Sequence, residues 1–130
     1  MTIKTPVQLR WNDIDMLGHL YNGTYHNLFD IGLREFHVNS LGINYTTGSK
    51  LWLLKVSSTI NYIEQVKIDD TIEVQTTLTK VGTKSVTFYQ ELINTKQGSV
   101  VANCTSVAVA YDPLGSCSVA VPDIIRNFVG

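Results

Sequence analysis

The apolar residues of this chain change their spacing once, and that change limits the folds open to it. From Asn22 onward, apolar and small side chains recur at steps of three and four residues, the spacing of one helical face. The members of this face are Tyr25, Leu28, Phe29, Gly32, Leu33 and Phe36. After residue 50 the helical spacing is lost, and the sequence predicts four strands over residues 51–63, 71–81, 85–94 and 100–111. One long helix followed by successive strands predicts an α+β domain, in which an antiparallel sheet packs against the helix.

The predicted helix carries signals at both ends and in its middle. Asn22 or Thr24 is placed to cap its start, and Gly42 follows its end at a suitable stop. Gly32 falls on the apolar face, where a helical glycine costs roughly 1 kcal/mol relative to alanine. We therefore expect the helix to approach a neighbouring element closely at this glycine.

The remaining segments complete a sheet that one helix cannot cover. Alternation over residues 5–12 predicts a strand before the helix, and Pro122 opens a short terminal helix. The residues predicted on one face of the first strand are Val7, Leu9 and Trp11. Segment 100–111 carries small or apolar residues on both faces, which predicts a strand in the interior of the sheet. Because one helix covers only one face of such a sheet, a dimer is the expected completion.

Composition excludes several classes of function. A length of 130 residues suits a single domain that spans residues 1–130. The formal net charge of −1 lacks the basic excess that nucleic-acid-binding domains carry. No apolar run approaches the roughly 20 residues that span a bilayer, and the N-terminus lacks the apolar core of a signal peptide. Cys104 and Cys117 show neither CxxC spacing nor a disulfide framework. We expect a cytoplasmic protein with no nucleic-acid or membrane partner and no bound cofactor.

The segment from Arg10 to Asn22 gathers the candidate reactive side chains. Asp13, Asp15 and His19 lie there, between a predicted strand and the start of the predicted helix. A helix N-terminus presents unpaired N–H groups and the positive end of the helix dipole, which could bind a developing oxyanion. A carboxylate a few residues upstream could attack the carbonyl, or deprotonate a water that does. These parts suit acyl transfer to water.

Two other interpretations of this segment stay open on spacing alone. Aspartate caps helices and stabilises turns, so the loop could be purely structural. Asp13, Asp15 and His19 could also be drawn as metal ligands, although they lack a recognised ligand spacing such as HExxH, and we expect no metal. His26 and His37 are isolated on the helix, and we expect each of them at the surface or at an interface.

The same segment resembles the signature of the 4-hydroxybenzoyl-CoA thioesterase group of the hot-dog superfamily. In that signature a strand ends in DxD, and two residues later G-H-[VL]-x-N leads to a tyrosine three residues on. Here it stands as Asp13-Ile-Asp15-Met-Leu-Gly18-His19-Leu-Tyr-Asn22-Gly-Thr-Tyr25, followed by Asp30 and Arg34. The strand order and the chain length also match the family. The resemblance implies a hot-dog fold, with an antiparallel sheet wrapped around one long central helix, and an acyl-CoA thioesterase.

The resemblance also implies roles for particular residues of the site. The second aspartate of DxD is the catalytic carboxylate of the family, acting as nucleophile or general base, and it corresponds to Asp15. Asp13 would then be a supporting or structural residue. The backbone N–H groups at the start of the central helix, at Asn22 and Gly23, would stabilise the oxyanion.

The family binds CoA at a subunit interface, so the resemblance implies a homodimer or homotetramer. A basic residue in the turn between the third and fourth strands often meets the CoA phosphates, which makes Lys84 a candidate; a solvated turn lysine is the alternative. His19 and Tyr25 are further candidates for contact with the substrate. An acyl-carrier-protein thioesterase and a non-catalytic acyl-CoA-binding module remain alternative functions.

Overall fold

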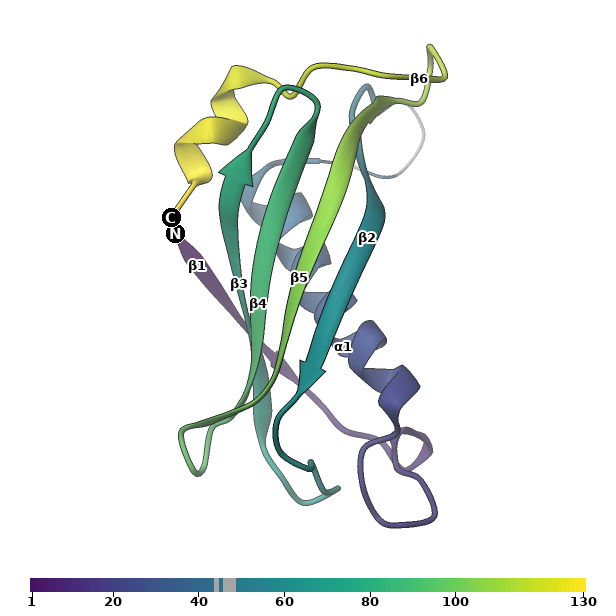
Figure 1. The fold of residues 1–130 in the computed structure, drawn as a ribbon, viewed down its shortest axis with the longest axis vertical. Coiled ribbons are helices and arrows are strands. Elements are labelled where there is room, and N and C mark those ends of the chain that lie inside the picture. Colours follow the sequence, from purple (N-terminus) through teal and green to yellow (C-terminus); the bar gives the residue numbers. More distant parts are fainter. Residues whose placement is uncertain (44, 46–48) are drawn as a thin grey trace.

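The structure, a computed structural model, describes residues 1–43, 45 and 49–130. Its centre is an antiparallel sheet that curls around one long helix, α1 (Asn22–Glu35), as Figure 1 shows. The strands are β1 (Thr2–Val7), β2 (Trp52–Tyr62), β3 (Ile72–Val81), β4 (Ser85–Asn94), β5 (Ser99–Asp112) and β6 (Cys117–Ser118). They lie in the order β1-β3-β4-β5-β2, and β6 pairs with β5. This is the α+β hot-dog arrangement that the sequence predicts.

Helix α1 buries the face that its spacing predicts. The residues of that face that are buried are Tyr25, Leu28, Phe29, Gly32, Leu33 and Phe36. The N-terminal half of the helix packs into one apolar cluster with β3, β4 and β5, and the C-terminal half packs into a second. The helix therefore lies along the concave side of the sheet and supplies much of both clusters.

The ends of α1 differ in how well the sequence predicted them. Tyr21 is the N-cap residue and makes no side-chain cap hydrogen bond, so the predicted capping by Asn22 or Thr24 is wrong. At the other end the chain continues through a π-helical turn at Phe36–Ser40. Gly42 follows with φ of +68°, a conformation that glycine adopts readily, and this confirms the predicted stop.

Gly32 lets the helix rest directly on the sheet, as predicted. A Cβ atom at this position would lie 2.6 Å from Val74 Cγ1 and 2.7 Å from Thr76 Oγ1. Beside it, the buried Gln90 side chain donates from Nε2 to the Phe29 carbonyl at 2.8 Å and to Thr76 Oγ1 at 2.9 Å. The middle of α1 is thus fixed to β3 and β4 by contact and by a buried hydrogen bond.

The first strand begins and ends earlier than the predicted segment 5–12. β1 stops at Val7, and the chain forms a 3-10 turn at Trp11–Asp13. Trp11 is 79% exposed, so its predicted place on an inward strand face is wrong. The alternation of apolar residues continues past the sheet, but local hydrogen bonds close a turn there, including Asp13 N–H to the Arg10 carbonyl at 2.9 Å.

The later strands match the predicted segments to within one residue, apart from the unpredicted β6. β5 lies between β4 and β2, which confirms its predicted interior position. β2 is the last strand at one edge of the described sheet, and its residues 54–57 are exposed. The predicted terminal helix is a 3-10 helix at Asp123–Phe128, with Ile125 buried. No helix in residues 1–43, 45 and 49–130 is long and apolar enough to cross a membrane.

Candidate functional site

Asp13 holds both ends of the loop that precedes α1. Its buried carboxylate accepts hydrogen bonds from the Arg10 backbone N–H at 2.8 Å and from the Arg10 guanidinium at 3.2 Å. Its carbonyl accepts the Tyr21 N–H at 2.7 Å, one residue before the helix begins. Both carboxylate oxygens are therefore occupied, which fits a structural residue.

Asp15 begins a tight turn in which, unlike Asp13, only one carboxylate oxygen accepts hydrogen bonds from the described residues. Oδ1 accepts the N–H groups of Leu17 at 2.9 Å and of His19 at 3.2 Å, while the Asp15 N–H donates to the His19 carbonyl at 2.8 Å. Gly18 closes the turn with φ of +79°, which a residue with a side chain rarely adopts. Within the part of the chain that the structure describes, Oδ2 has no protein hydrogen bond. The turn thus fixes the carboxyl group and leaves one oxygen free.

The start of α1 is open to a ligand. The first N–H groups of a helix have no partner within the helix, and Tyr21 supplies no side-chain cap. The first turn also contains no acidic residue that would offset the positive end of the helix dipole. A Cβ at Gly23 would come within 2.8 Å of the Tyr21 ring, so the ring lies close over this turn. The helix tip can therefore accept an electron-rich oxygen.

A pocket of about 350 Å³ joins these two features, and we call it the Asp15 pocket. Four of the predicted site residues line it, namely Asp15, His19, Asn22 and Tyr25. Gly23 lies next to Asn22 in the helix but does not line the pocket. The other wall is the end of β2 and the segment after it, from Tyr62 to Gln65.

Tyr62 and Glu64 are pocket residues that the sequence did not single out. The rings of Tyr25 and Tyr62 meet edge to face, with centroids 4.9 Å apart. Burial, and then the neighbouring Tyr62, raise the pKa of Tyr25. Glu64 places a second carboxylate at the pocket and accepts a hydrogen bond from Ser99 Oγ at 3.2 Å. Only the pairing of strands brings this segment against α1, so no local sequence pattern marks it.

Lys84 does not join the Asp15 pocket within one chain. It lies in the exposed turn between β3 and β4, where its carbonyl accepts the Ala110 N–H at 2.8 Å and its Nζ lies 3.5 Å from Ser118 Oγ. Figure 1 shows this turn at one end of the sheet and the start of α1 at the other. If Lys84 meets the ligand of an Asp15 pocket, it does so in another subunit.

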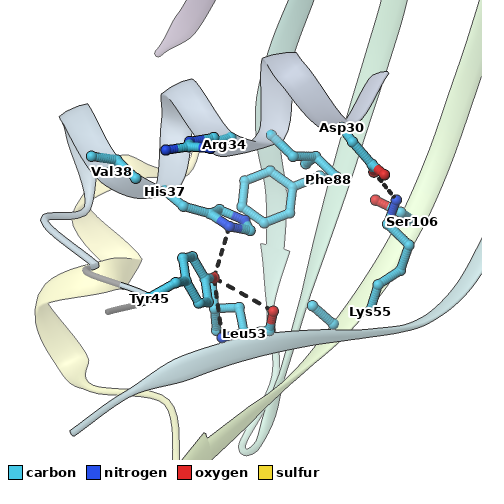
Figure 2. Close-up of a pocket in the computed structure, with 11 residues that line it drawn as sticks. Asp30, Arg34, His37, Val38, Tyr45, Leu53, Lys55, Phe88 and Ser106 are labelled. Atoms are coloured by element: carbon cyan, nitrogen blue, oxygen red, sulfur yellow. Dashed lines mark hydrogen bonds and ion pairs between the residues drawn. The ribbon is translucent and has the colours of Figure 1, made fainter. Parts of the chain in front are cut away.

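A larger pocket of about 630 Å³ lies between the second half of α1 and β2, and we call it the His37 pocket (Figure 2). Its residues include His37, Tyr45 and Lys55. His37 is only 8% exposed, so its predicted place at the surface is wrong; His26 is exposed, as predicted. The π-helical turn that follows α1 buries His37 as well as Phe36; the helical spacing predicts burial of Phe36 but not of His37.

No three His, Cys, Asp or Glu side chains among residues 1–43, 45 and 49–130 come together in a way that could hold a metal ion. At the Asp15 pocket the described residues supply a carboxylate, polar side chains and backbone N–H groups. A free carboxylate oxygen and an uncapped helix tip border the same pocket. That pair can act on a carbonyl group placed between them.

Comparison with known proteins decides the family. A model of the thioesterase-like superfamily matches residues 9–129. The chain belongs to the thioesterase-like superfamily. A curated relative, the acyl-CoA thioester hydrolase YbgC of Escherichia coli O6:H1, is 23% identical over 95% of this chain and 92% of its own.

Solved structures share the fold across almost the whole chain. The PA5185 protein of Pseudomonas aeruginosa aligns with a TM-score of 0.88 and 28% identity, over 98% of this chain and 88% of its own. A predicted thioesterase from Bacillus stearothermophilus aligns with a TM-score of 0.85 and 22% identity, over 100% and 98%. The chain thus has the hot-dog fold of the thioesterase-like superfamily.

Proposed function

We propose that the protein hydrolyses acyl-CoA thioesters, with Asp15 as the catalytic carboxylate. The observation that carries this proposal is the Asp15 pocket itself. Asp15 Oδ2 is free of protein hydrogen bonds in the described chain, and the uncapped tip of α1 at Asn22 borders the same cavity. The relative YbgC is named as an acyl-CoA thioester hydrolase, which supports CoA as the carrier of the acyl group.

In the proposed reaction, the N–H of Asn22, which lines the pocket, binds the thioester carbonyl oxygen as it gains negative charge, and the N–H of Gly23, next to it outside the lining, would be a second donor. Asp15 then acts in one of two ways. As nucleophile, Oδ2 bonds to the carbonyl carbon, the CoA thiolate leaves, and water hydrolyses the resulting anhydride to restore Asp15. As general base, it takes a proton from a water that attacks the same carbon, and that proton goes to the leaving thiolate. His19 and Tyr25 line the pocket and would contact the substrate.

A homodimer formed through β2 would complete this site. β2 is an edge strand whose backbone is open to pairing on one side. Antiparallel pairing of two β2 strands about a two-fold axis sets the Tyr62 end of one strand against the Trp52 end of the other. The Asp15 pocket of one subunit would then adjoin the His37 pocket of its partner. In this dimer the β3–β4 turn of the partner, which carries Lys84, would lie at the same end of the molecule as the Asp15 pocket, where Lys84 could meet the CoA phosphates.

The acyl group would pass from Asp15 into the His37 pocket of the partner. Within one chain, His37 lies fifteen residues beyond Asn22, which is roughly 22 Å along the helix axis. That span is too long for a short acyl group. The two-fold arrangement shortens it, because the Tyr62 and Trp52 ends of paired strands lie side by side.

Asp15→Asn tests the proposal. Asparagine keeps an oxygen that can accept the Leu17 and His19 N–H groups, so the turn should persist while the charged oxygen is lost. We expect turnover of the best acyl-CoA substrate to fall at least about 100-fold, the scale of a lost catalytic base. The matched control is Asp70→Asn, because Asp70 also caps a turn, through the Lys67 N–H at 2.9 Å, but lies outside the pocket. Turnover by Asp15→Asn at the level of this control would refute the role of Asp15.

The same assay separates the alternative functions. Faster turnover of an acyl group on acyl carrier protein than on CoA would identify a carrier-protein thioesterase, since both carriers present the same pantetheine arm. Tight acyl-CoA binding with no hydrolysis across a broad panel would identify a binding module instead.

A further inference from the structure

The His37 pocket contains a buried nitrogen that the protein leaves without a partner. The Nδ1 atom of His37 lies 2.8 Å from the hydroxyl oxygen of Tyr45 (Figure 2). Its Nε2 atom is shielded from solvent and has no hydrogen-bond partner in the described chain. A buried polar atom without a partner is costly, and native structures keep few of them. Such an atom on a side chain in a pocket wall indicates a ligand that can pair with it.

The contact with Tyr45 determines which nitrogen of the His37 ring carries the hydrogen. The Tyr45 oxygen accepts the Leu53 N–H at 3.3 Å and lies 2.8 Å from His37 Nδ1 but 3.5 Å from the Leu53 carbonyl oxygen. We therefore assign the hydroxyl proton to the shorter contact, with His37 Nδ1 as its acceptor. Burial, and then the Lys55 ammonium, lower the pKa of His37 to about 4, so the ring is neutral at neutral pH. A neutral imidazole that accepts at Nδ1 carries its hydrogen on Nε2. The unpartnered atom is therefore a donor, and it lacks an acceptor.

The other walls of the pocket define the group that would bring this acceptor. Leu33, Leu53, Phe88 and Ala108 form apolar walls around the ring. The volume of about 630 Å³ lies in the range of small-molecule sites. Lys55 lines the pocket but is already paired with Asp30. The pocket thus fits a mainly apolar group that carries an acceptor oxygen far from its point of attachment.

We propose that His37 determines acyl specificity by donating from Nε2 to an oxygen at the distal end of the acyl group. This inference rests on the proposed function, because the acyl group enters the pocket from the Asp15 site of the partner subunit. An acyl group that ends in a ketone or hydroxyl oxygen pairs with the donor. An unsubstituted acyl group of the same length leaves the donor unpaired.

A matched series of substrates tests the selectivity. Straight-chain acyl-CoAs of several lengths are each compared with the analogues that end in a methyl ketone, a hydroxyl or a carboxylate. We expect the wild type to prefer the ketone and hydroxyl analogues at the length that spans the pocket. In His37→Phe the ratio of kcat/KM values, oxygenated over plain, should fall about 3- to 10-fold, as for one neutral hydrogen bond. Tyr45→Phe should lower the ratio in part, because Nε2 is then no longer held as the donor.

The matched control is Val38→Ala, which changes the pocket wall without removing a polar atom, so the ratio should hold. A ratio that His37→Phe leaves unchanged overturns the proposal. So does a preference confined to the carboxylate analogue that is lost in Arg34→Ala, since Arg34 also lines the pocket and would then be the specificity residue.

Direct binding separates this inference from the proposed function. Titration of ¹⁵N-histidine-labelled wild type with 2-octanone should shift the Nε2 resonance of His37 saturably, and the shift should be weaker with Tyr45→Phe. If the ketone binds in this way but no acyl-CoA is hydrolysed, the hydrolase assignment fails and the ligand site stands. If acyl-CoAs are hydrolysed without preference and the resonance does not move, the role of His37 is refuted alone.

Discussion

Acid should destabilise this protein through His37, and the size of the effect follows from its burial. As the pH is lowered, the free energy of unfolding decreases wherever the unfolded chain binds more protons than the native one. A histidine in an unfolded chain has a pKa near 6.5, whereas burial and Lys55 lower that of native His37 to about 4, against a smaller opposing effect of Asp30. Above about pH 7 the ring is neutral in both states, and it makes no pH-dependent contribution. As the pH falls from 6.5 toward 4, the unfolded chain takes up the proton first.

The expected loss of stability from this one group is roughly 2–3 kcal/mol between pH 7.5 and pH 4.5, at about 1.36 kcal/mol for each unit of pKa difference. Carboxylates contribute their own acid dependence, so the measurement is a difference between wild type and His37→Gln. Glutamine does not titrate, and both proteins carry the same acidic residues. Below about pH 3, where the ring is protonated in both states, the two curves should run parallel again.

The assay is urea unfolding followed by circular dichroism at half-unit steps of pH. Protein concentration is held constant, because the apparent stability of an oligomer depends on it. The difference between the free energies of unfolding of wild type and His37→Gln should be constant above pH 7. As the pH falls to 4.5, wild type should lose stability relative to His37→Gln by the expected amount. A difference that stays constant from pH 7.5 to pH 4.5 would show that native His37 titrates as in the unfolded chain, and the argument from burial would be refuted.

Two further predictions concern the helix contact and the expected CoA contact. Gly32→Ala should lower the free energy of unfolding by about 1–2 kcal/mol despite the better helix propensity of alanine, because the new Cβ would lie 2.6 Å from Val74 Cγ1. The control Asn27→Ala, at an exposed position of the same helix, should cause no loss, and stabilisation by Gly32→Ala would contradict the close contact. Lys84→Ala should raise KM for acyl-CoA several-fold with little change in kcat, whereas Lys96→Ala, in the β4–β5 turn, should change neither; equal effects of the two would argue against a phosphate contact at Lys84.

Most of the secondary structure could be predicted from local patterns in the sequence. The helical face of α1 and the limits of β2 to β5 follow from apolar spacing, because burial on one face imposes a period on the residues that form it. Gly32 and Gly42 were also predictable, since glycine in a helical pattern costs free energy unless close packing or a positive φ requires it. The grouping of Asp15, His19 and Asn22 was predictable because they are close neighbours along one loop and the start of one helix.

Features that depend on distant parts of the chain were not predictable in this way. Trp11 continues an alternating pattern but lies outside the sheet, because the chain turns before the pairing with β3 can extend to it. Tyr62 and Glu64 enter the Asp15 pocket only through the pairing of β2 with β5, which sets the end of β2 against α1.

The sequence alone determined one long helix, a series of strands after it and a carboxylate placed before a helix tip, because each of these depends on residues that are near one another in the chain. Only the tertiary structure decided that His37 is buried beside Tyr45 and that Lys84 lies at the far end of the sheet from Asp15. Burial and separation in space depend on how the strands and the helix pack, and packing joins residues that no local spacing relates.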